Sequence, residues 1–151
     1  MVFPYVCFGS LQITAPSRYS RALDRLVPDI ITSAHPVEGE GNIGSVRQFN
    51  FTSVPPFSFM KEKLDFVDAE KCECKSTLIE GGGIGTSTET TTLHIKVKPT
   101  AICGSVVKVE LNYKLPLGVE VKEEISKAKN SVTIIFKGVE AYLVANQDAY
   151  N

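Results

Sequence analysis

Two segments in the second half of the sequence alternate between apolar and polar residues. They are TSTETTTLHIKVKP (86–99) and SVVKVELNYKLP (105–116). One face of each segment is apolar and the opposite face carries lysines and other polar residues, as in strands whose side chains point alternately to the two faces of a sheet. This pattern predicts neighbouring strands of an antiparallel sheet that is packed on one side and open to solvent on the other.

A different period begins after these strands. From residue 120 to about 145, apolar residues recur every three or four positions: Val121, Ile125, Ala128, Val132, Ile135, Val139 and Leu143. They form the stripe of a helix of about seven turns. The apolar face of the sheet and the apolar stripe of the helix are both buried if the two elements pack together. The sequence therefore predicts an α+β fold with a sheet curved around the helix.

Shorter patterns extend this arrangement towards the N-terminus. Segments 45–53, 56–68 and 71–81 are strand-like, whereas 15–26 and 27–34 are expected to be two short helical pieces. In the first two strands, Arg47, Phe49 and Phe51 share one face, and Phe57 and Phe59 are expected on the apolar face with Lys61 and Lys63 further along it. At 151 residues the chain is expected to form a single domain, 1–151.

A glycine pattern near residue 40 has the G-x-G-x-x-G spacing of a dinucleotide-binding turn, with Gly39, Gly41 and Gly44. That turn requires a helix after the glycines, whose N-terminus meets the pyrophosphate. Here a strand-like segment, 45–51, follows instead, and no Gly-Lys-Ser/Thr ending is present. The glycines are therefore interpreted as a tight loop between two strands that brings the backbone close to the end of the long helix.

Composition excludes several other function classes. The net charge of −1 offers no positive field for nucleic acid, and neither a signal peptide nor an 18-residue apolar span is evident. The cysteines (Cys7, Cys72, Cys74 and Cys103) lack Cys-x-x-Cys spacing, and neither His35 nor His94 has a plausible nucleophile or metal partner. We expect a cytoplasmic protein with reduced thiols, no metal, no cofactor, no membrane contact and no nucleic-acid partner.

Four separated motifs resemble one known family. They are VEGEGNIGSVRQF (37–49), PFSFMKEKLDFVD (56–68), STLIEGGGIGTSTE (76–89) and GVEAYLVANQDAYN (138–151). In this order they resemble the plant pathogenesis-related class 10 proteins, the START-like family of the birch major pollen allergen. The resemblance implies a helix-grip fold: a seven-stranded curved antiparallel sheet around a long C-terminal helix, two short helices and a large internal cavity.

The resemblance also implies a function. Family members look like carriers of amphiphilic plant metabolites or hormones such as flavonoids, cytokinins and steroids, in defence or stress, and a few relatives are biosynthetic enzymes. This chain departs from the family pattern at Asn42 (usually glycine), at Arg47 (usually lysine), and at Cys74 and Ser76 (often tyrosines). The link between the two expected short helices, near 24–28, is also shorter than is usual in the family. We expect the protein to be a monomer or a weak dimer.

The expected ligand-binding residues combine the inward strand faces with the facing side of the helix. They are Arg47, Phe49, Phe51, Phe57, Phe59, Cys74, Ser76, Leu78, Glu89, Thr91, Leu93, Ile95, Val109, Tyr113, Ala128, Ser131, Val132, Ile135 and Tyr142, beside the loop glycines Gly39, Gly41 and Gly44. By spacing alone, the pattern of the apolar members favours a solid core, and the resemblance is what implies a cavity lining. Arg47 and Glu89 are the charged exceptions, and buried charges need a partner or nearby solvent.

Two catalytic alternatives remain open at this point. Glu89, Glu140 and Tyr142 match family positions proposed for a weak ribonuclease activity, but the favoured interpretation is a structural polar cluster that ties the helix to the sheet edge. A small-molecule enzyme for condensation or isomerisation is the other alternative, with Glu89 as its best carboxylate.

Overall fold

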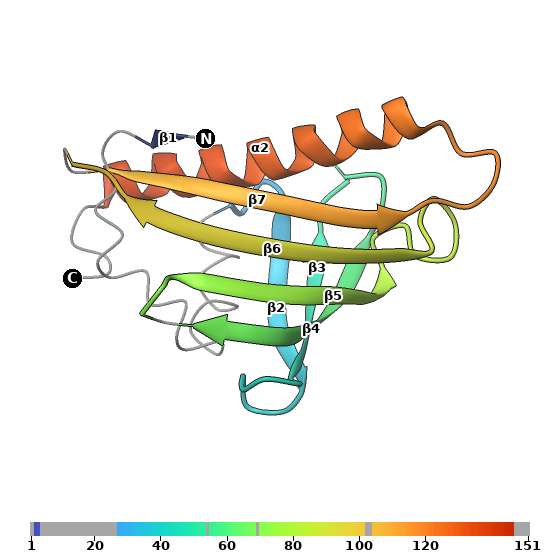
Figure 1. Cartoon of the computed structure of the whole chain (residues 1–151), viewed down its shortest axis with the longest axis horizontal. Coiled ribbons are helices and arrows are strands. Elements are labelled where there is room, and N and C mark those ends of the chain that lie inside the picture. Colours follow the sequence, from blue (N-terminus) through green and yellow to red (C-terminus); the bar gives the residue numbers. More distant parts are fainter. Residues whose placement is uncertain (1, 4–26, 54, 69, 102–103, 147–151) are drawn as a thin grey trace.

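The computed structural model describes residues 2–3, 27–53, 55–68, 70–101 and 104–146. Its elements appear in Figure 1. The strands are β1 (Val2–Phe3), β2 (Ile31–Glu38), β3 (Val46–Phe51), β4 (Phe59–Asp68), β5 (Glu73–Gly81), β6 (Thr90–Pro99) and β7 (Ser105–Lys114), and the helix is α2 (Val121–Ala145). No helix in the described part of the chain has the length and apolar character needed to cross a membrane.

The strands form one seven-stranded sheet in the order β1-β7-β6-β5-β4-β3-β2, and every neighbouring pair is antiparallel. From β2 to β7 the order in the sheet follows the order in the chain, so each connection joins adjacent strands. In Figure 1, α2 runs beside β7 for most of its length. The predicted α+β fold, with a seven-stranded antiparallel sheet and a long C-terminal helix, is confirmed.

The prediction of a short helix over 27–34 is wrong. Residues 27–30 form a turn, in which the N–H groups of Ile30 and Ile31 both donate to the Val27 carbonyl, and β2 begins at Ile31. The consecutive β-branched residues Ile30, Ile31 and Thr32 favour extended structure. Pairing with β3, which sets Ile31 opposite Phe51, then fixes the strand. The other expected short helix, 15–26, lies outside the described residues.

Strand register decides which side chains of β4 face inward. Met60 pairs with Phe49, whose side chain is buried in the core, so Met60 lies on the inward face. Phe59 pairs with Asn50 and lies on the opposite face, so the prediction that Phe59, Lys61 and Lys63 face inward is wrong. The inward positions belong to Met60, Glu62 and Leu64 instead, the last two of which are buried.

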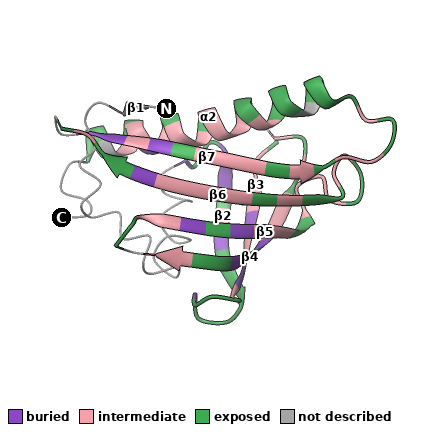
Figure 2. Cartoon of the chain, in the orientation of Figure 1, coloured by how far each residue is buried: buried purple, intermediate pink, exposed green. Residues whose placement is uncertain are grey.

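The C-terminal half of α2 anchors the helix to the sheet through two buried clusters. The first contains Val27, Ile30, Ile31, Ala34, Phe49 and Val139, with Ile135 and Tyr142 packed against it. The second contains Val97 and Val107, with Phe136 packed against it. The N-terminal turns of α2 are exposed, as the green residues in Figure 2 show, and Val121 retains 54% of its accessible surface.

The glycine loop between β2 and β3 packs against β4. Gly39, Gly41 and Gly44 all have positive φ, from +74° to +97°, a region that favours glycine. The Gly41 N–H donates to Ser45 Oγ over 2.9 Å, and the Gly44 N–H donates to the Leu64 carbonyl over 2.7 Å.

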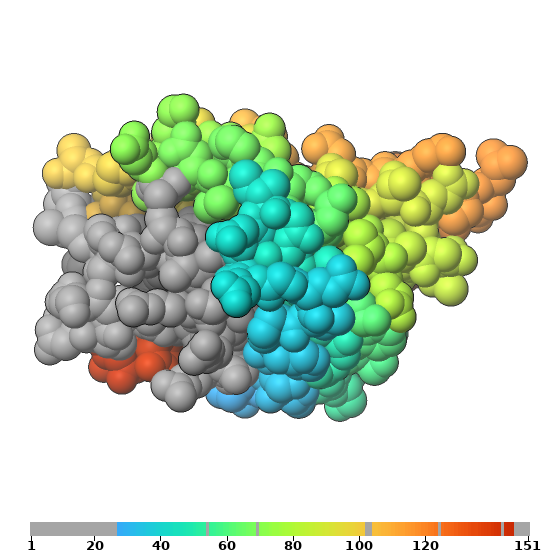
Figure 3. Space-filling view, turned by 90° about the horizontal axis from the view of Figure 1, so that it is seen from below, coloured from blue at the N-terminus to red at the C-terminus, as the bar shows by residue number. Residues whose placement is uncertain are grey.

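This packing corrects one expectation and confirms another. The loop does connect two strands, but it does not approach the end of α2. Figure 1 places it at the end of the molecule away from the helix, and in Figure 3 its residues, coloured cyan, lie on the surface that faces the viewer.

Candidate ligand-binding site

The inward face of β5, β6 and β7 is a series of cross-strand rows. Ile95 pairs with Val109, Leu93 with Leu111 and Thr91 with Tyr113. Although these residues lie on the face that the helix covers, all six are only half-buried. The next row, Val97 and Val107, is buried at 5% and 2% exposure. The interior is therefore close-packed at one end of these strands and less filled further along them.

A hollow lies between β7 and α2, beside these rows. Its volume is about 250 Å³. The strand side is formed by Val107, Val109 and Leu111, and the helix side by Lys129, Val132, Thr133 and Phe136.

A buried polar cluster lies on the inward face of β3, β4 and β5. The Arg47 guanidinium pairs with Glu62 Oε1, and Ser76 Oγ donates to Glu62 Oε2 over 3.1 Å. The side chains of Arg47 and Glu62 are only 15% and 3% exposed. The Arg47 guanidinium carbon also lies 5.3 Å from the centre of the Phe49 ring. The inward position of Arg47 agrees with the prediction, and its partner supplies the compensation that a buried charge requires.

Glu62 was missed because it lies within a Lys-Glu-Lys run, which resembles a solvated face. The usable signal was its parity: Met60, Glu62 and Leu64 alternate, so the glutamate is aligned with two apolar neighbours.

Cys74 is the neighbouring inward residue of β5. Burial raises the pKa of the Cys74 thiol to about 11; the positive charge of Arg47 opposes this rise and the negative charge of Glu62 adds to it. At neutral pH the thiol is therefore protonated, and it serves as a small neutral wall group rather than a nucleophile. The Cys74 thiol forms no disulfide.

The structure does not bring Glu89, Glu140 and Tyr142 together. Glu89 is exposed and pairs with Lys114 over 2.6 Å, while Tyr142 packs against the first core cluster. Figure 1 shows the start of β6 and the C-terminal end of α2 at opposite ends of the molecule. The inward placement of Glu89 is wrong because β6 begins only at Thr90, so strand alternation does not extend to residue 89.

The remaining predicted residues are half-buried. Phe57 is half-buried and meets Phe51 edge-to-face, with ring centres 5.2 Å apart. Leu78 pairs with Glu62 and Thr91, which places it on the inward face. Four α2 positions from the predicted set are also half-buried: Ala128, Ser131, Val132 and Ile135.

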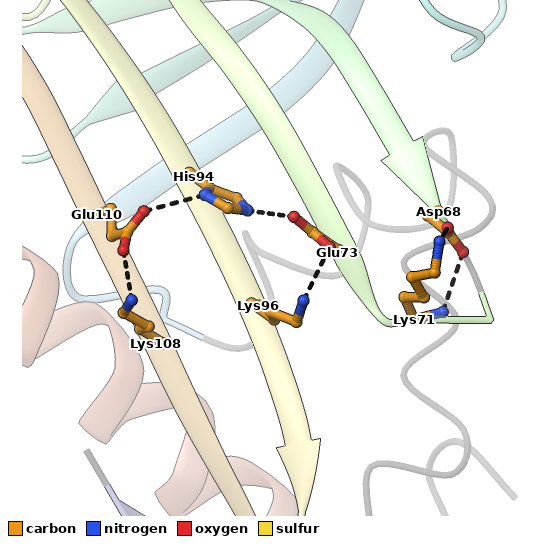
Figure 4. A network of polar contacts seen from close by, with 7 residues as sticks. All are labelled: Asp68, Lys71, Glu73, His94, Lys96, Lys108 and Glu110. Atoms are coloured by element: carbon orange, nitrogen blue, oxygen red, sulfur yellow. Dashed lines mark hydrogen bonds and ion pairs between the residues drawn. The ribbon is translucent and has the colours of Figure 1, made fainter.

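A second polar group lies on the outward face of the sheet, as Figure 4 shows. His94 lies between two carboxylates: its Nε2 is 2.6 Å from Glu73 Oε1 and its Nδ1 is 3.1 Å from Glu110 Oε2. Lys96 and Lys108 complete the two ends of this chain of contacts. His94 therefore faces outward, as predicted. Within the described ranges, no group of three or more His, Cys, Asp or Glu residues is arranged to hold a metal ion.

This outward network predicts a measurable pH effect. Hydrogen bonds from Lys96 and then His94 hold the pKa of Glu73 below its ordinary 4.5, and bonds from Lys108 and then His94 do the same for the pKa of Glu110. Because both values are lowered on folding, the unfolded chain binds more protons in this range. The network's contribution to stability is present above the ordinary carboxyl pKa and is lost as the pH falls through the lowered value.

We expect the substitution His94→Gln to raise the titration midpoints of both glutamates towards 4.5, as followed by carbon-13 NMR of the carboxyl groups. Lys98→Gln, on the same outward face of β6, is the control and should leave both midpoints in place. Unchanged midpoints in His94→Gln would contradict the contacts drawn in Figure 4.

The sequence of this chain is similar to those of several known plant proteins. The chain is 44% identical over 127 residues to "Pathogenesis-related protein 1" of Asparagus officinalis, covering 83% of this chain and 79% of the relative. It is 32% identical to "Major allergen Pru av 1" of Prunus avium, covering 99% of each chain.

Two solved structures share the fold. The crystal structure of Ara h 8.0201 matches with a TM-score of 0.78 at 23% identity, covering 97% of this chain and 95% of the other. Norcoclaurine synthase from Thalictrum flavum, solved with dopamine and hydroxybenzaldehyde, matches with a TM-score of 0.76 at 18% identity, covering 97% and 84%. The model of the pathogenesis-related protein Bet v 1 family matches residues 16–146. Motif order, sheet topology and these matches agree, and the chain belongs to the Bet v 1 family.

Proposed function

We propose that this protein binds a small hydrophobic or amphiphilic molecule between the inward face of the sheet and α2, as a non-catalytic carrier. The observation that carries the proposal is the half-buried state of the apolar rows on β6 and β7. Apolar side chains in a protein interior are normally packed to high density. Rows that retain accessible surface beside a hollow of about 250 Å³ offer apolar area for a ligand to cover.

Two kinds of wall suit an amphiphile. Apolar contact contributes roughly 25 cal/mol per Å² of buried surface, so the rows of β6 and β7 supply affinity. The paired Arg47 and Glu62, with Ser76, supply a polar group without net charge. Such a wall favours neutral, hydroxylated molecules, because an ionised group placed there would require a new partner. Flavonoid-, cytokinin- and steroid-like compounds have this chemistry.

Membership of the Bet v 1 family supports the same conclusion and suggests the setting. The proposed role is that of a cytoplasmic protein of plant defence or stress that holds such a metabolite or hormone. The relative from Asparagus officinalis carries the description "pathogenesis-related".

The proposal is tested by narrowing the space at the centre of β6. Leu93 pairs with Leu111 on the inward face, and Thr92 is exposed on the outward face. Replacing Leu93 by the larger tryptophan fills part of the space in front of the apolar rows on β6 and β7. A ligand that loses about 60 Å² of apolar contact loses roughly 1.5 kcal/mol of binding free energy, which raises its dissociation constant about tenfold.

The measurement is titration with the neutral fluorescent dye Nile red, followed by displacement with a flavonoid such as quercetin. We expect Leu93→Trp to bind the dye about tenfold more weakly, and Thr92→Trp to bind it like the parent protein. Urea denaturation of both variants verifies that they are folded. Equal dye affinity in the two variants, or dye that no compound in a broad panel displaces, would exclude this site.

A further inference from the structure

One wall residue of the hollow between β7 and α2 carries a charge. Lys129 lines this hollow and is itself exposed, so its ammonium lies at the rim. No described residue forms an ion pair or hydrogen bond with the Lys129 side chain. Lys127 on the same helix is different, because it pairs with Glu123 over 2.8 Å. The nearest same-face neighbours of Lys129, one turn away, are Ile125 and Thr133, and neither carries a negative charge.

Thr133 adds a hydrogen-bond donor beside this charge. It follows Lys129 by one helical turn, lines the same hollow and is half-buried. Its hydroxyl makes no hydrogen bond to another described residue. An ammonium and a hydroxyl one turn apart offer donors to both oxygens of a carboxylate, and hydrogen bonds to a charged acceptor are the stronger kind.

The rest of the hollow is apolar. Val109 and Leu111 lie on the strand side, and Val132 and Phe136 lie on the helix side. The volume of about 250 Å³ lies just below the roughly 300–1,000 Å³ of pockets for drug-sized ligands. The space therefore suits a body of one or two rings, with its polar end directed to the rim.

We propose that this hollow is a subsite for a small aromatic carboxylic acid, whose ring packs between β7 and α2 and whose carboxylate binds Lys129 and Thr133. The inference rests on the proposed function, since it assigns a ligand class to part of the same interior. It goes beyond that function because the cluster of Arg47, Glu62 and Ser76 favours neutral groups, whereas the rim at Lys129 selects an anion.

Two probes with the same ring system separate the charge from the apolar body: 2-naphthoate, which is anionic, and 2-naphthalenemethanol, which is neutral. Binding of each is measured by isothermal titration calorimetry to the full chain. In the parent protein, naphthoate should bind several-fold more tightly than the alcohol. Lys129→Gln should weaken naphthoate binding by about three- to tenfold and leave the alcohol unchanged.

A matched control and a salt series complete the test. Lys98→Gln removes an exposed lysine from the outward face of β6 and should change neither affinity. Raising the ionic strength from roughly 0.02 to 0.2 M should weaken naphthoate binding in the parent protein but not in Lys129→Gln, because exposed charges are screened by salt.

The outcomes distinguish the two proposals. If the alcohol binds and naphthoate binds no better, with Lys129→Gln without effect, the carboxylate subsite is wrong while the proposed carrier function stands. If Lys98→Gln weakens naphthoate binding as much as Lys129→Gln does, the effect is one of net charge and the subsite is again wrong. If neither probe binds and Nile red also fails to bind, both proposals are overturned.

Discussion

Replacing Arg47 by methionine is expected to lower the free energy of unfolding by about 3–5 kcal/mol. The substitution removes the cation that pairs with Glu62, whose side chain is only 3% exposed. The carboxylate would keep its hydrogen bond from Ser76 but would lose the charge that compensates its burial. Removing one member of a buried pair is costly because the other charge stays behind in a poorly solvated place. Urea denaturation of parent and variant measures the difference.

Two controls separate this pair from an ordinary surface contact. The double variant Arg47→Met with Glu62→Met replaces both charges by apolar side chains and should recover most of the lost stability. Lys61→Met removes the more exposed ion pair between Lys61 and Glu80. Lys61 directly precedes Glu62 in β4 and points to the opposite face of the sheet, so its loss should lower the free energy of unfolding by less than about 1 kcal/mol. If Arg47→Met behaves like Lys61→Met, the inward pair is not a buried ion pair in solution.

The parts of the fold that the sequence predicted well are those with one buried and one solvated face. The long helix was expected from residue 120 to about 145 and spans Val121–Ala145. The alternation over 86–99 and 105–116 likewise predicted β6 and β7 with the correct inward residues from Thr91 onward, although not at Glu89, which precedes β6. In these elements one face is buried, so apolar residues recur with the period of the helix or strand. The stretch 27–34 has no such period, and its conformation depends on pairing with β3.

The candidate site was harder to predict because strand register is a tertiary property. The pairing of β4 with β5 shifts between Lys61 and Glu62 and again between Leu64 and Phe66. Such irregularities change which residues face inward and leave no mark in the alternation of apolar residues. Phe59 was placed on the wrong face for a different reason: its parity was taken from Phe57, which precedes β4, whereas pairing with Asn50 of β3 sets its face. Arg47 was placed correctly, but its partner Glu62 is 15 positions away in the chain and only the fold brings the two together.

The same clusters that hold α2 also define where the interior is open. The C-terminal half of the helix packs against Phe49 and its neighbours from 27–34, while the first turns of the helix are exposed. Any ligand that enters between β7 and α2 therefore meets a helix fixed at one end. The stability of the fold and the shape of the binding space depend on the same anchor.

Phe49→Ala tests this anchor and is expected to cost about 3–5 kcal/mol of unfolding free energy. Phe49 is 2% exposed and packs with Ala34, Ile31 and Val139, so its removal leaves a cavity between β2, β3 and α2. The loss of packing beneath the helix should also weaken Nile red binding, because α2 is no longer held at a fixed distance from the rows of β6 and β7.

Phe57→Ala is the matched control, since it removes the same side chain from a half-buried position whose ring meets Phe51 edge-to-face. Its expected cost is smaller, about 1–2 kcal/mol, because less apolar surface is lost and solvent can refill the site. Urea denaturation gives both values, and Nile red titration of the folded fraction gives the second readout. If Phe49→Ala costs no more than Phe57→Ala, the first cluster does not fix the position of α2. If Phe49→Ala lowers stability but leaves dye affinity unchanged, the binding space is held by the second cluster around Val97 and Val107 instead.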